Sequence, residues 1–457
     1  MLRITVLGAG LAGLSAAEEL VRRGHEVTVL EKDPSYGGLA ATVKMDGFEY
    51  DLGPHRFHTS NGNILDFVKE LPGIELLELN RISRIRLLDR YFDYPLAFSN
   101  VLSTMPLHKG IGMMFSFLWE SIRGLFAPRE QESFEGWVLS RFGRGLYDLY
   151  LAPYNEKLWG IKPSQLSADW ASQRITVPSL AGLIKETIAP SKETVRSLVS
   201  TFHYPRGGIG EICHGLAARV TESGGCILLS TKPTGLHKTG DGWRIDFENG
   251  HIFSEKIINT IPVNEYTKLL GDILPAKVHR AALDLKFRAL VFLTVMLDSD
   301  VTPADHWIYT SEDRYLFNRL SISRNFDPDV PAQVVFEFSC ETNDRIWNMS
   351  RDELLKATVP GAEHLGLFSA HMVVGAHLTR REHAYPIYDL TYARNTSMVL
   401  DALDKIPDSV TCGRQGLFRY NNMDHSIEMG KYAAFEILGE ASVKSHFDWD
   451  ENTWSDG

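Results

Sequence analysis

The pattern of apolar positions changes period twice near the amino end of the chain. Residues 4–7 (ITVL) form a short, β-branched run that predicts a buried strand, and the following LSAAEELVRRG has the apolar spacing of an amphipathic helix. The run EVTVLEK then predicts a second strand, which ends at Glu31. A strand, a helix and a strand in this order predict one βαβ unit of a parallel sheet.

Further along, helical and strand-like patterns alternate in blocks. Residues 76–200 have the pattern of long amphipathic helices, and strands are predicted over 226–262 and 285–340. Helices follow at 398–405 and 424–438. We therefore predict an α/β fold with a discontinuous Rossmann-type domain, an inserted helical domain and a mixed or antiparallel β-sheet substrate domain. The expected boundaries are 1–75, 201–280 and 395–440 for the first, 76–200 for the second, 281–394 for the third, and 441–457 for a polar tail.

Composition narrows the class of protein. The net charge of -11 argues against sequence-independent binding of nucleic acid. Four widely separated cysteines show no zinc-finger spacing and are typical of reduced thiols, so we expect a cytoplasmic protein without a metal site. Because the sequence opens with the first strand, we expect no signal peptide. The most apolar segment, 111–128, is interrupted by Glu120 and Arg123, so we expect a core or lid helix; contact with a membrane surface stays an alternative.

A glycine-rich turn joins the first strand to the first helix. Gly8, Gly10 and Gly13 have GxGxxG spacing. In that spacing the first glycine permits the tight turn, the second lets the backbone approach a pyrophosphate, and the third allows close packing of helix and strand. Glu31, at the end of the second strand, is placed to accept hydrogen bonds from a ribose. The four residues predict a dinucleotide site.

Two further segments indicate that the dinucleotide is FAD. Gly37, Gly38 and Leu39 lie in SYGGLAAT, where an extended FAD passes close to the backbone beyond the first βαβ unit. CGRQGLFRYNNMDHSIEMG, near the carboxyl end, supplies a strand, a glycine turn and a helix start for the flavin end; its candidate contacts are Gly413, Arg414, Met423 and Asp424. These elements together resemble the FAD-binding domain of flavin amine oxidases, phytoene desaturases, protoporphyrinogen oxidases and UDP-galactopyranose mutases.

The remaining motifs resemble the UDP-galactopyranose mutases in order along nearly the whole chain. GPHRFHT (His55 and His58) is similar to their GxHxFHT, and YNEKLWG (154–160) to their Y-[TN]-x-K-x-W segment. SQRI matches their mobile-loop arginine at Arg174, and LFNRLSISRNF places Arg319 where a second active-site arginine belongs. Arg56 stands where the family has an apolar residue, and we assign it no role beyond a surface charge.

The resemblance implies a pyranose/furanose mutase acting on a nucleotide sugar, with no net redox change. In that family reduced flavin attacks the anomeric carbon through N5 as the nucleotide diphosphate leaves. Arg174 and Arg319 would stabilise the diphosphate, and His58, with His55 beside it, would lie against the flavin. The implied substrate contacts are Tyr154 and Asn155 for the base, Trp159 for the pocket floor, and Tyr385, Tyr388 and Tyr420 for the diphosphate.

Two other functions stay open at this stage. One is a true flavin oxidoreductase of the amine oxidase, desaturase or protoporphyrinogen oxidase type, for which the apolar helix near 113–126 is the best support. The other is a non-enzymatic role for FAD in a complex. The sequence leaves open the sugar and base of the substrate, the oligomeric state, and whether NAD(P)H is the reductant.

Overall fold

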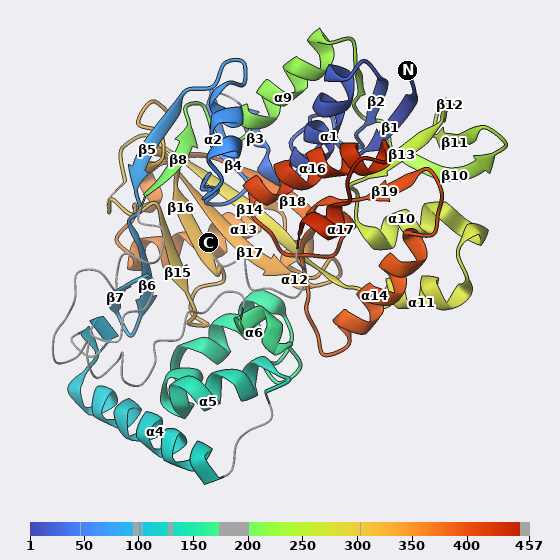
Figure 1. Ribbon diagram of the computed structural model, residues 1–457. Helices are drawn as coiled ribbons and strands as arrows, with labels where there is room; N and C mark the ends of the chain where they lie inside the picture. The colour runs from blue at the N-terminus through green and yellow to red at the C-terminus, as the bar shows by residue number, and fades with distance from the viewer. Residues whose placement is uncertain are drawn as a thin grey trace.

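The computed structural model of the protein describes residues 1–45, 47–94, 100–101, 104–126, 131–172, 201–301 and 303–447. Two sheets lie beside one another, and a group of helices closes one end of the molecule (Figure 1). Helices α1 (Leu11–Arg22) and α16 (Met423–Ile437) come from opposite ends of the chain and pack side by side. Amino- and carboxyl-terminal segments therefore build one unit.

That unit is a five-stranded, fully parallel sheet with the order β19-β13-β1-β2-β9. The predicted βαβ unit is its centre, and Ile4, Val6 and Val29 are among its buried side chains. Helix α1 also packs against α9 (Glu211–Glu222). The strands are β1 (Arg3–Leu7), β2 (Glu26–Leu30), β9 (Cys226–Leu228), β13 (Lys256–Asn259) and β19 (Ser409–Thr411).

A small antiparallel sheet and three helices lie beside the parallel sheet. The sheet consists of β10 (Pro233–Thr239), β11 (Gly242–Phe247) and β12 (Gly250–Ser254). The helices are α10 (Val263–Leu270), α11 (Ala276–Asp284) and α14 (Tyr392–Leu403). Helices α14 and α16 confirm the two helices predicted near the carboxyl end, although α14 begins six residues earlier than expected, at 392 instead of 398.

The second sheet has seven strands in the order β18-β14-β17-β16-β15-β6-β7. All of its pairs are antiparallel except β6 with β15. In β14 every residue after Phe287 is buried, as its continuous apolar run predicts. Helix α13 (Arg351–His364) packs on β14 and β18. The strands are β6 (Ser83–Leu87), β7 (Arg90–Asp93), β14 (Phe287–Leu297), β15 (Trp307–Thr310), β16 (Arg319–Ile322), β17 (Gln333–Cys340) and β18 (Val373–Pro386).

The prediction of helices from residue 76 onward is wrong for the first part of that segment. Residues 76–93 form β5 (Leu76–Asn80), β6 and β7, and β5 pairs with β8 (Thr201–Pro205). In β6 the residues Ser83, Ile85 and Leu87 are buried, while Arg84 and Arg86 between them are partly exposed. This period of two is that of a strand. A further ribbon, β3 (Thr42–Met45) with β4 (Phe48–Asp51), precedes it.

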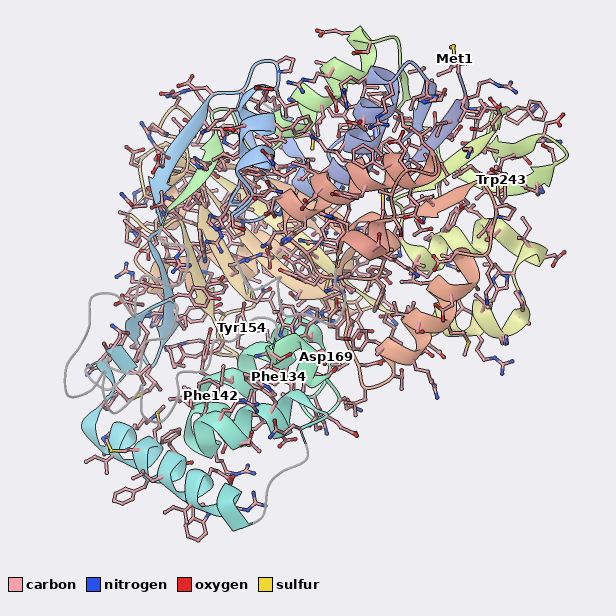
Figure 2. All side chains as sticks on the ribbon, viewed as in Figure 1. Met1, Phe134, Phe142, Tyr154, Asp169 and Trp243 are labelled. Carbon is pink, nitrogen blue, oxygen red and sulfur yellow. The ribbon has the colours of Figure 1, made fainter. Side chains whose placement is uncertain are left out.

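Several helices group together as a unit at the lower end of the view (Figure 1). They are α4 (Leu107–Phe126), α5 (Phe134–Leu146), α6 (Ala152–Trp159) and α7 (Ala168–Ser172), with one π-helical turn at Tyr147–Leu151. Tyr154 of α6 lies where this unit meets the seven-stranded sheet (Figure 2). None of the helices described is long and apolar enough to span a membrane.

Candidate active site

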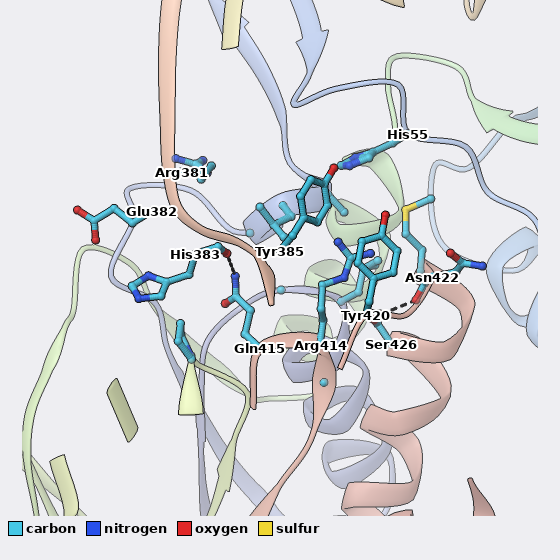
Figure 3. A pocket seen from close by; sticks show the side chains of 18 of the residues that line it. His55, Arg381, Glu382, His383, Tyr385, Arg414, Gln415, Tyr420, Asn422 and Ser426 are labelled. Carbon is cyan, nitrogen blue, oxygen red and sulfur yellow. Dashed lines mark hydrogen bonds between the residues drawn. The ribbon is translucent and has the colours of Figure 1, made fainter. Parts of the chain in front are cut away.

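A cavity of about 560 Å³ lies where the parallel sheet, the seven-stranded sheet and α6 meet. Glycine-rich backbone from 8–12 and 37–40 lines one part of it, and tyrosine, tryptophan and arginine side chains line another. The α15 turn (Gly413–Gly416) and the first turn of α16 complete the wall. Figure 3 shows the side chains of Tyr385, Arg414 and Tyr420 close together in this wall.

The glycine-lined part of the cavity depends on backbone conformations that residues other than glycine rarely adopt. Gly8 has φ +99° and Gly37 has φ +112°, both in the left-handed region. The Gly37 N–H donates to the Ala9 carbonyl at 2.8 Å, which fixes the second glycine pair beside the first turn. A Cβ on Gly13 would lie 1.9 Å from the Gly8 carbonyl oxygen, so Gly13 allows helix packing and does not line the cavity.

Glu31 lines the cavity at the end of β2. Its carboxylate accepts hydrogen bonds from the backbone N–H groups of Ala9 (2.8 Å) and Asp33 (2.9 Å). Burial raises the pKa of this carboxyl, and the two backbone donors oppose that shift. The carboxylate thus fixes the glycine turn and keeps further acceptor capacity toward the cavity.

The carboxyl-terminal segment contributes three of its four predicted contacts. Gly413, Arg414 and Met423 line the cavity, whereas Asp424 lies in the first turn of α16 outside the lining residues. Gly413 has φ +80°, and a Cβ there would lie 3.0 Å from Cβ of Ala12. The Arg414 guanidinium lies over the Tyr420 ring at 4.7 Å.

The loop with GPHRFHT is anchored on both sides. Asp51 accepts hydrogen bonds from Thr42 Oγ1 (2.6 Å), Tyr204 Oη (2.7 Å) and the Ile209 N–H (3.1 Å). Burial raises the Asp51 pKa to about 6, and these donors limit the shift. Phe57 exchanges backbone hydrogen bonds with His203 at 2.9 and 2.7 Å. The loop is therefore held in place against the cavity.

Both histidines of this loop line the cavity. Burial, together with the charges of Arg319 and Arg414, lowers the His55 pKa to about 3. His55 is thus a neutral imidazole at pH 7, and its Nδ1 has no hydrogen-bond partner among the described residues. Within the described chain no three His, Cys, Asp or Glu side chains are grouped to hold a metal ion.

Arg319, at the start of β16, is paired inside the cavity. Its Nη2 donates to Glu337 Oε2 at 2.6 Å and to Tyr385 Oη at 3.2 Å. Asn318 Nδ2 donates to the other Glu337 oxygen at 3.0 Å. Burial alone would lower the Arg319 pKa, but the Glu337 carboxylate holds it well above its usual range. Arg319 stays charged, and Nε has no hydrogen-bond partner among the described residues.

Aromatic side chains from α6 and its neighbours form the wall beside Arg319. Tyr154 stacks on Tyr150 (5.5 Å between ring centroids) and meets Tyr309 edge-on at 5.7 Å. Trp159 contacts Trp170 edge-on at 4.6 Å, and both line the cavity. Asn155 also lines it, but its Nδ2 donates to the Leu151 carbonyl (2.8 Å) and its Oδ1 accepts from Trp170 Nε1 (3.3 Å). Both polar atoms of Asn155 are therefore engaged within the protein.

Of the other predicted tyrosines, two line the cavity and one packs behind it. Tyr385 and Tyr420 line it with their rings 5.4 Å apart. Tyr388 does not line it; its hydroxyl accepts from the Tyr420 N–H at 2.8 Å, and its ring stacks on Tyr392. Arg174 lies outside the described residues.

Several lining residues escaped the sequence analysis. Arg56 lines the cavity with its Nη1 atom fully buried, so the assignment of a surface charge was wrong. The sequence does show a cation between His55 and His58, but whether that cation is buried depends on segments distant in sequence. Glu337 had a clearer signal, because a single acid in the buried run QVVFEFSC requires a partner. The remaining ones include Tyr94, Tyr309, Trp170, Trp307 and Arg381.

Residues 11–404 match the family of flavin-containing amine oxidoreductases, which is most of the chain. The chain belongs to this family. A reduced UDP-galactopyranose mutase is 22% identical, with a TM-score of 0.82 over 99% of this chain and 97% of that one. Wild-type putrescine oxidase bound to putrescine is 15% identical, with a TM-score of 0.63 over 96% and 99%. At these identities the likeness shows a common fold, and it confirms the predicted fold class.

A curated relative matches a short segment only. The 4,4'-diapophytoene desaturase (4,4'-diaponeurosporene-forming) of Staphylococcus aureus (strain bovine RF122 / ET3-1) is 47% identical over 53 residues. That segment is 12% of this chain and 11% of the desaturase, so the match covers about a tenth of the relative.

Membership of the family implies an FAD cofactor, and the cavity fits one. A Cβ added to Gly10, the N-cap of α1, would meet no protein atom within 4 Å, so the open start of this helix faces free space. Helix starts of this kind bind pyrophosphate. Six lining residues also carry a buried nitrogen without a hydrogen-bond partner in the described chain: His55, Arg56, Trp159, Trp307, Arg319 and Arg381. Such groups are normally satisfied, so the cavity is built for a polar ligand.

Proposed function

We propose that this flavoenzyme is a nucleotide-sugar pyranose/furanose mutase similar to UDP-galactopyranose mutase, working with reduced FAD and without net redox change. One observation carries the proposal. The substrate part of the cavity combines aromatic rings with arginines that have unpartnered donors among the described residues, at Arg56 and Arg319. A guanidinium suits a diphosphate, whereas a hydrocarbon would leave these donors unsatisfied and the Arg56 charge without a counter-ion.

The cofactor is assigned to the glycine-lined part. Gly8, Gly10, Gly37 and Gly38 would hold the pyrophosphate through their backbone, and Glu31 would accept from the ribose. Leu39, His55, Gly413, Arg414 and Met423 would surround the flavin. When bound and reduced, the flavin supplies a nucleophilic nitrogen for the anomeric carbon.

The protein's own groups would orient the substrate and stabilise the departing charge. Arg319 is held by Glu337 and Tyr385, so it presents a fixed, charged guanidinium to the diphosphate. Tyr154 would stack on the base, while Asn155 keeps Trp170 in place as a wall. His55 and His58 would face the flavin, and the neutral His55 could give or take one hydrogen bond without adding charge. We assign Arg174 to the diphosphate as well.

The proposal predicts isomerisation that requires reduction and no electron acceptor. The FAD-loaded protein, reduced and kept free of oxygen, would be incubated with UDP-galactose and other UDP-sugars, and the products separated by chromatography. We expect a ring isomer only with reduced enzyme, and a large loss in Arg319→Ala but not in Arg394→Ala, which changes an exposed arginine. Turnover only with an electron acceptor would refute the mutase.

An oxidoreductase acting on an apolar substrate is the second candidate, because one helix exposes an apolar face. In α4 six large apolar side chains at helical spacing are 41–70% exposed: Ile111, Met114, Phe115, Leu118, Trp119 and Ile122. Such a face would suit an enzyme that takes its substrate from a lipid phase. Acceptor-dependent oxidation of a lipid-soluble substrate, with no effect of Arg319→Ala, would favour it.

A further inference from the structure

Two lining arginines, Arg56 and Arg319, lie over aromatic side chains of the cavity, and a third, Arg81, which is not a lining residue, lies over one more of them. Trp307 and Tyr309 are two residues apart on β15, so they face the same side of the sheet. The Arg56 guanidinium lies 5.8 Å from the Trp307 ring centre, and that of Arg319 lies 5.9 Å from the Tyr309 ring centre. These contacts place two cations side by side along the strand.

The third arginine reaches the same surface from the other side. Arg81 lies 5.9 Å from the ring centre of Tyr94, and Tyr94 packs on Tyr309 at 4.7 Å. Its position is fixed because the next residue, Ile82, exchanges hydrogen bonds with His306 at 2.8 and 3.1 Å. The Arg56 backbone is fixed in turn by the Phe57–His203 pair.

Only one of the three charges has a counter-ion within the described residues. Arg319 is neutralised by Glu337. The charged or titratable groups that influence Arg56 are Arg81, Tyr94, Tyr309 and Tyr420, and those that influence Arg81 are tyrosines. Burial lowers the pKa of both guanidinium groups, and for Arg56 the charge of Arg81 adds to this. A buried cation without an acid is costly unless a ligand supplies the negative charge.

We propose that Arg56 and Arg81 form an anion subsite that is distinct from the Arg319–Glu337 pair and binds a carboxylate or phosphate group of the substrate. The aromatic surface beneath them accommodates the ring or base that bears this group. The proposal rests on the proposed function for its choice of nucleotide sugars. The anion has two sources, a carboxylate on the sugar or the diphosphate itself.

The first experiment tests the subsite without any nucleotide sugar. Thermal unfolding of the FAD-loaded protein would be followed as inorganic pyrophosphate is added. We expect stabilisation in the native protein and in Arg394→Leu, and its loss in Arg56→Leu and Arg81→Leu. Arg56→Lys keeps the charge without the fork and should retain part of the effect. If Arg56→Leu fails to fold, Arg56→Lys takes its place in the test. Equal stabilisation of the native protein and the Arg56 and Arg81 variants would overturn the subsite.

The second experiment identifies the source of the anion. Dissociation constants of UDP, UDP-galactose and UDP-galacturonic acid would be measured from the change in flavin absorbance. If the sugar supplies a carboxylate, Arg56→Leu should weaken only UDP-galacturonic acid, by about tenfold to a hundredfold. If the diphosphate binds there, all three should weaken equally. No change for any of them would overturn the proposal. Failure of the reduced native enzyme to isomerise any sugar would refute the mutase alone, because the pyrophosphate result stands without it.

Discussion

The guanidinium of Arg319 and the carboxylate of Glu337 form a 2.6 Å ion pair in which the acid is almost fully buried. The pair is neutral as a whole, so Arg319 would orient a ligand through hydrogen bonds more than attract it by net charge. In Glu337→Gln the arginine charge is left uncompensated. Breaking a buried pair in this way costs about 3–5 kcal/mol. We expect a lower urea midpoint for unfolding and tighter binding of UDP. Glu222→Gln, on an exposed acid, should change neither quantity. An unchanged midpoint in Glu337→Gln would contradict this account.

Substitutions at Gly13 and Gly10 should have different effects: the first on folding, the second on cofactor binding. Gly13→Ala places a Cβ 1.9 Å from the Gly8 carbonyl and should prevent stable folding. Gly10→Ala meets no protein atom, so it should fold normally but narrow the space for pyrophosphate. We expect its FAD affinity to fall at least about tenfold, which corresponds to ~1.4 kcal/mol of binding free energy. Circular dichroism and bound-flavin absorbance would distinguish the two variants. Full FAD retention in Gly10→Ala would exclude the assigned pyrophosphate position.

His55 makes stability depend on acidity. Its pKa is about 3 in the folded protein and 6.5 as the ordinary value, so below about pH 6.5 the unfolded chain binds a proton that the folded protein does not. This imidazole therefore destabilises the fold as pH decreases from about 6.5 toward 3, by up to ~1.4 kcal/mol per pH unit. In His55→Asn the fall should be shallower, measured as urea midpoints between about pH 7 and pH 4.5. His371→Asn, at an exposed position, should follow the native curve. Parallel curves for His55→Asn and the native protein would contradict the burial of a neutral imidazole.

Arg288 joins α6 to the seven-stranded sheet. Its Nε donates to the Leu158 carbonyl at 2.9 Å and its Nη2 to the Ser339 carbonyl at 3.2 Å. The contact at the end of α6 also places a cation at the negative end of the helix. Arg288→Met should lower the free energy of unfolding by about 2–4 kcal/mol, because buried carbonyls lose a charged donor. The exposed Arg280→Met serves as control. An unaltered denaturation curve would show that α6 is held by its apolar contacts alone.

The local sequence is sufficient to predict those parts of the fold that depend on neighbouring residues. The βαβ unit, its glycine turn and Glu31 depend on neighbouring residues, and each lies where the pattern predicts. Buried strands such as β14 and β17 were visible as long apolar runs. The strand β6 was missed because arginines occupy its partly exposed positions, where their stems cover apolar surface while the charge stays outside.

The candidate site was only partly predictable, because its chemistry depends on partners distant in sequence. Asn155 was expected to meet the base, but its neighbours Leu151 and Trp170 use both of its polar atoms. Arg56 was placed on the surface, since nothing near it in sequence shows that β15 covers it. The pairing of Arg319 with Glu337 requires β16 beside β17, a register that no motif encodes.

The parallel sheet has its first strand at its centre and its last strand, β19, at one edge. The cavity is lined both by Gly8 and by Ser426, which lie near opposite ends of the chain. A ribosome therefore synthesises the residues around Gly8 long before those around Ser426. If FAD binds as proposed, its site is complete only after the segment with Ser426 has emerged, so we expect cofactor uptake to follow the synthesis of that segment.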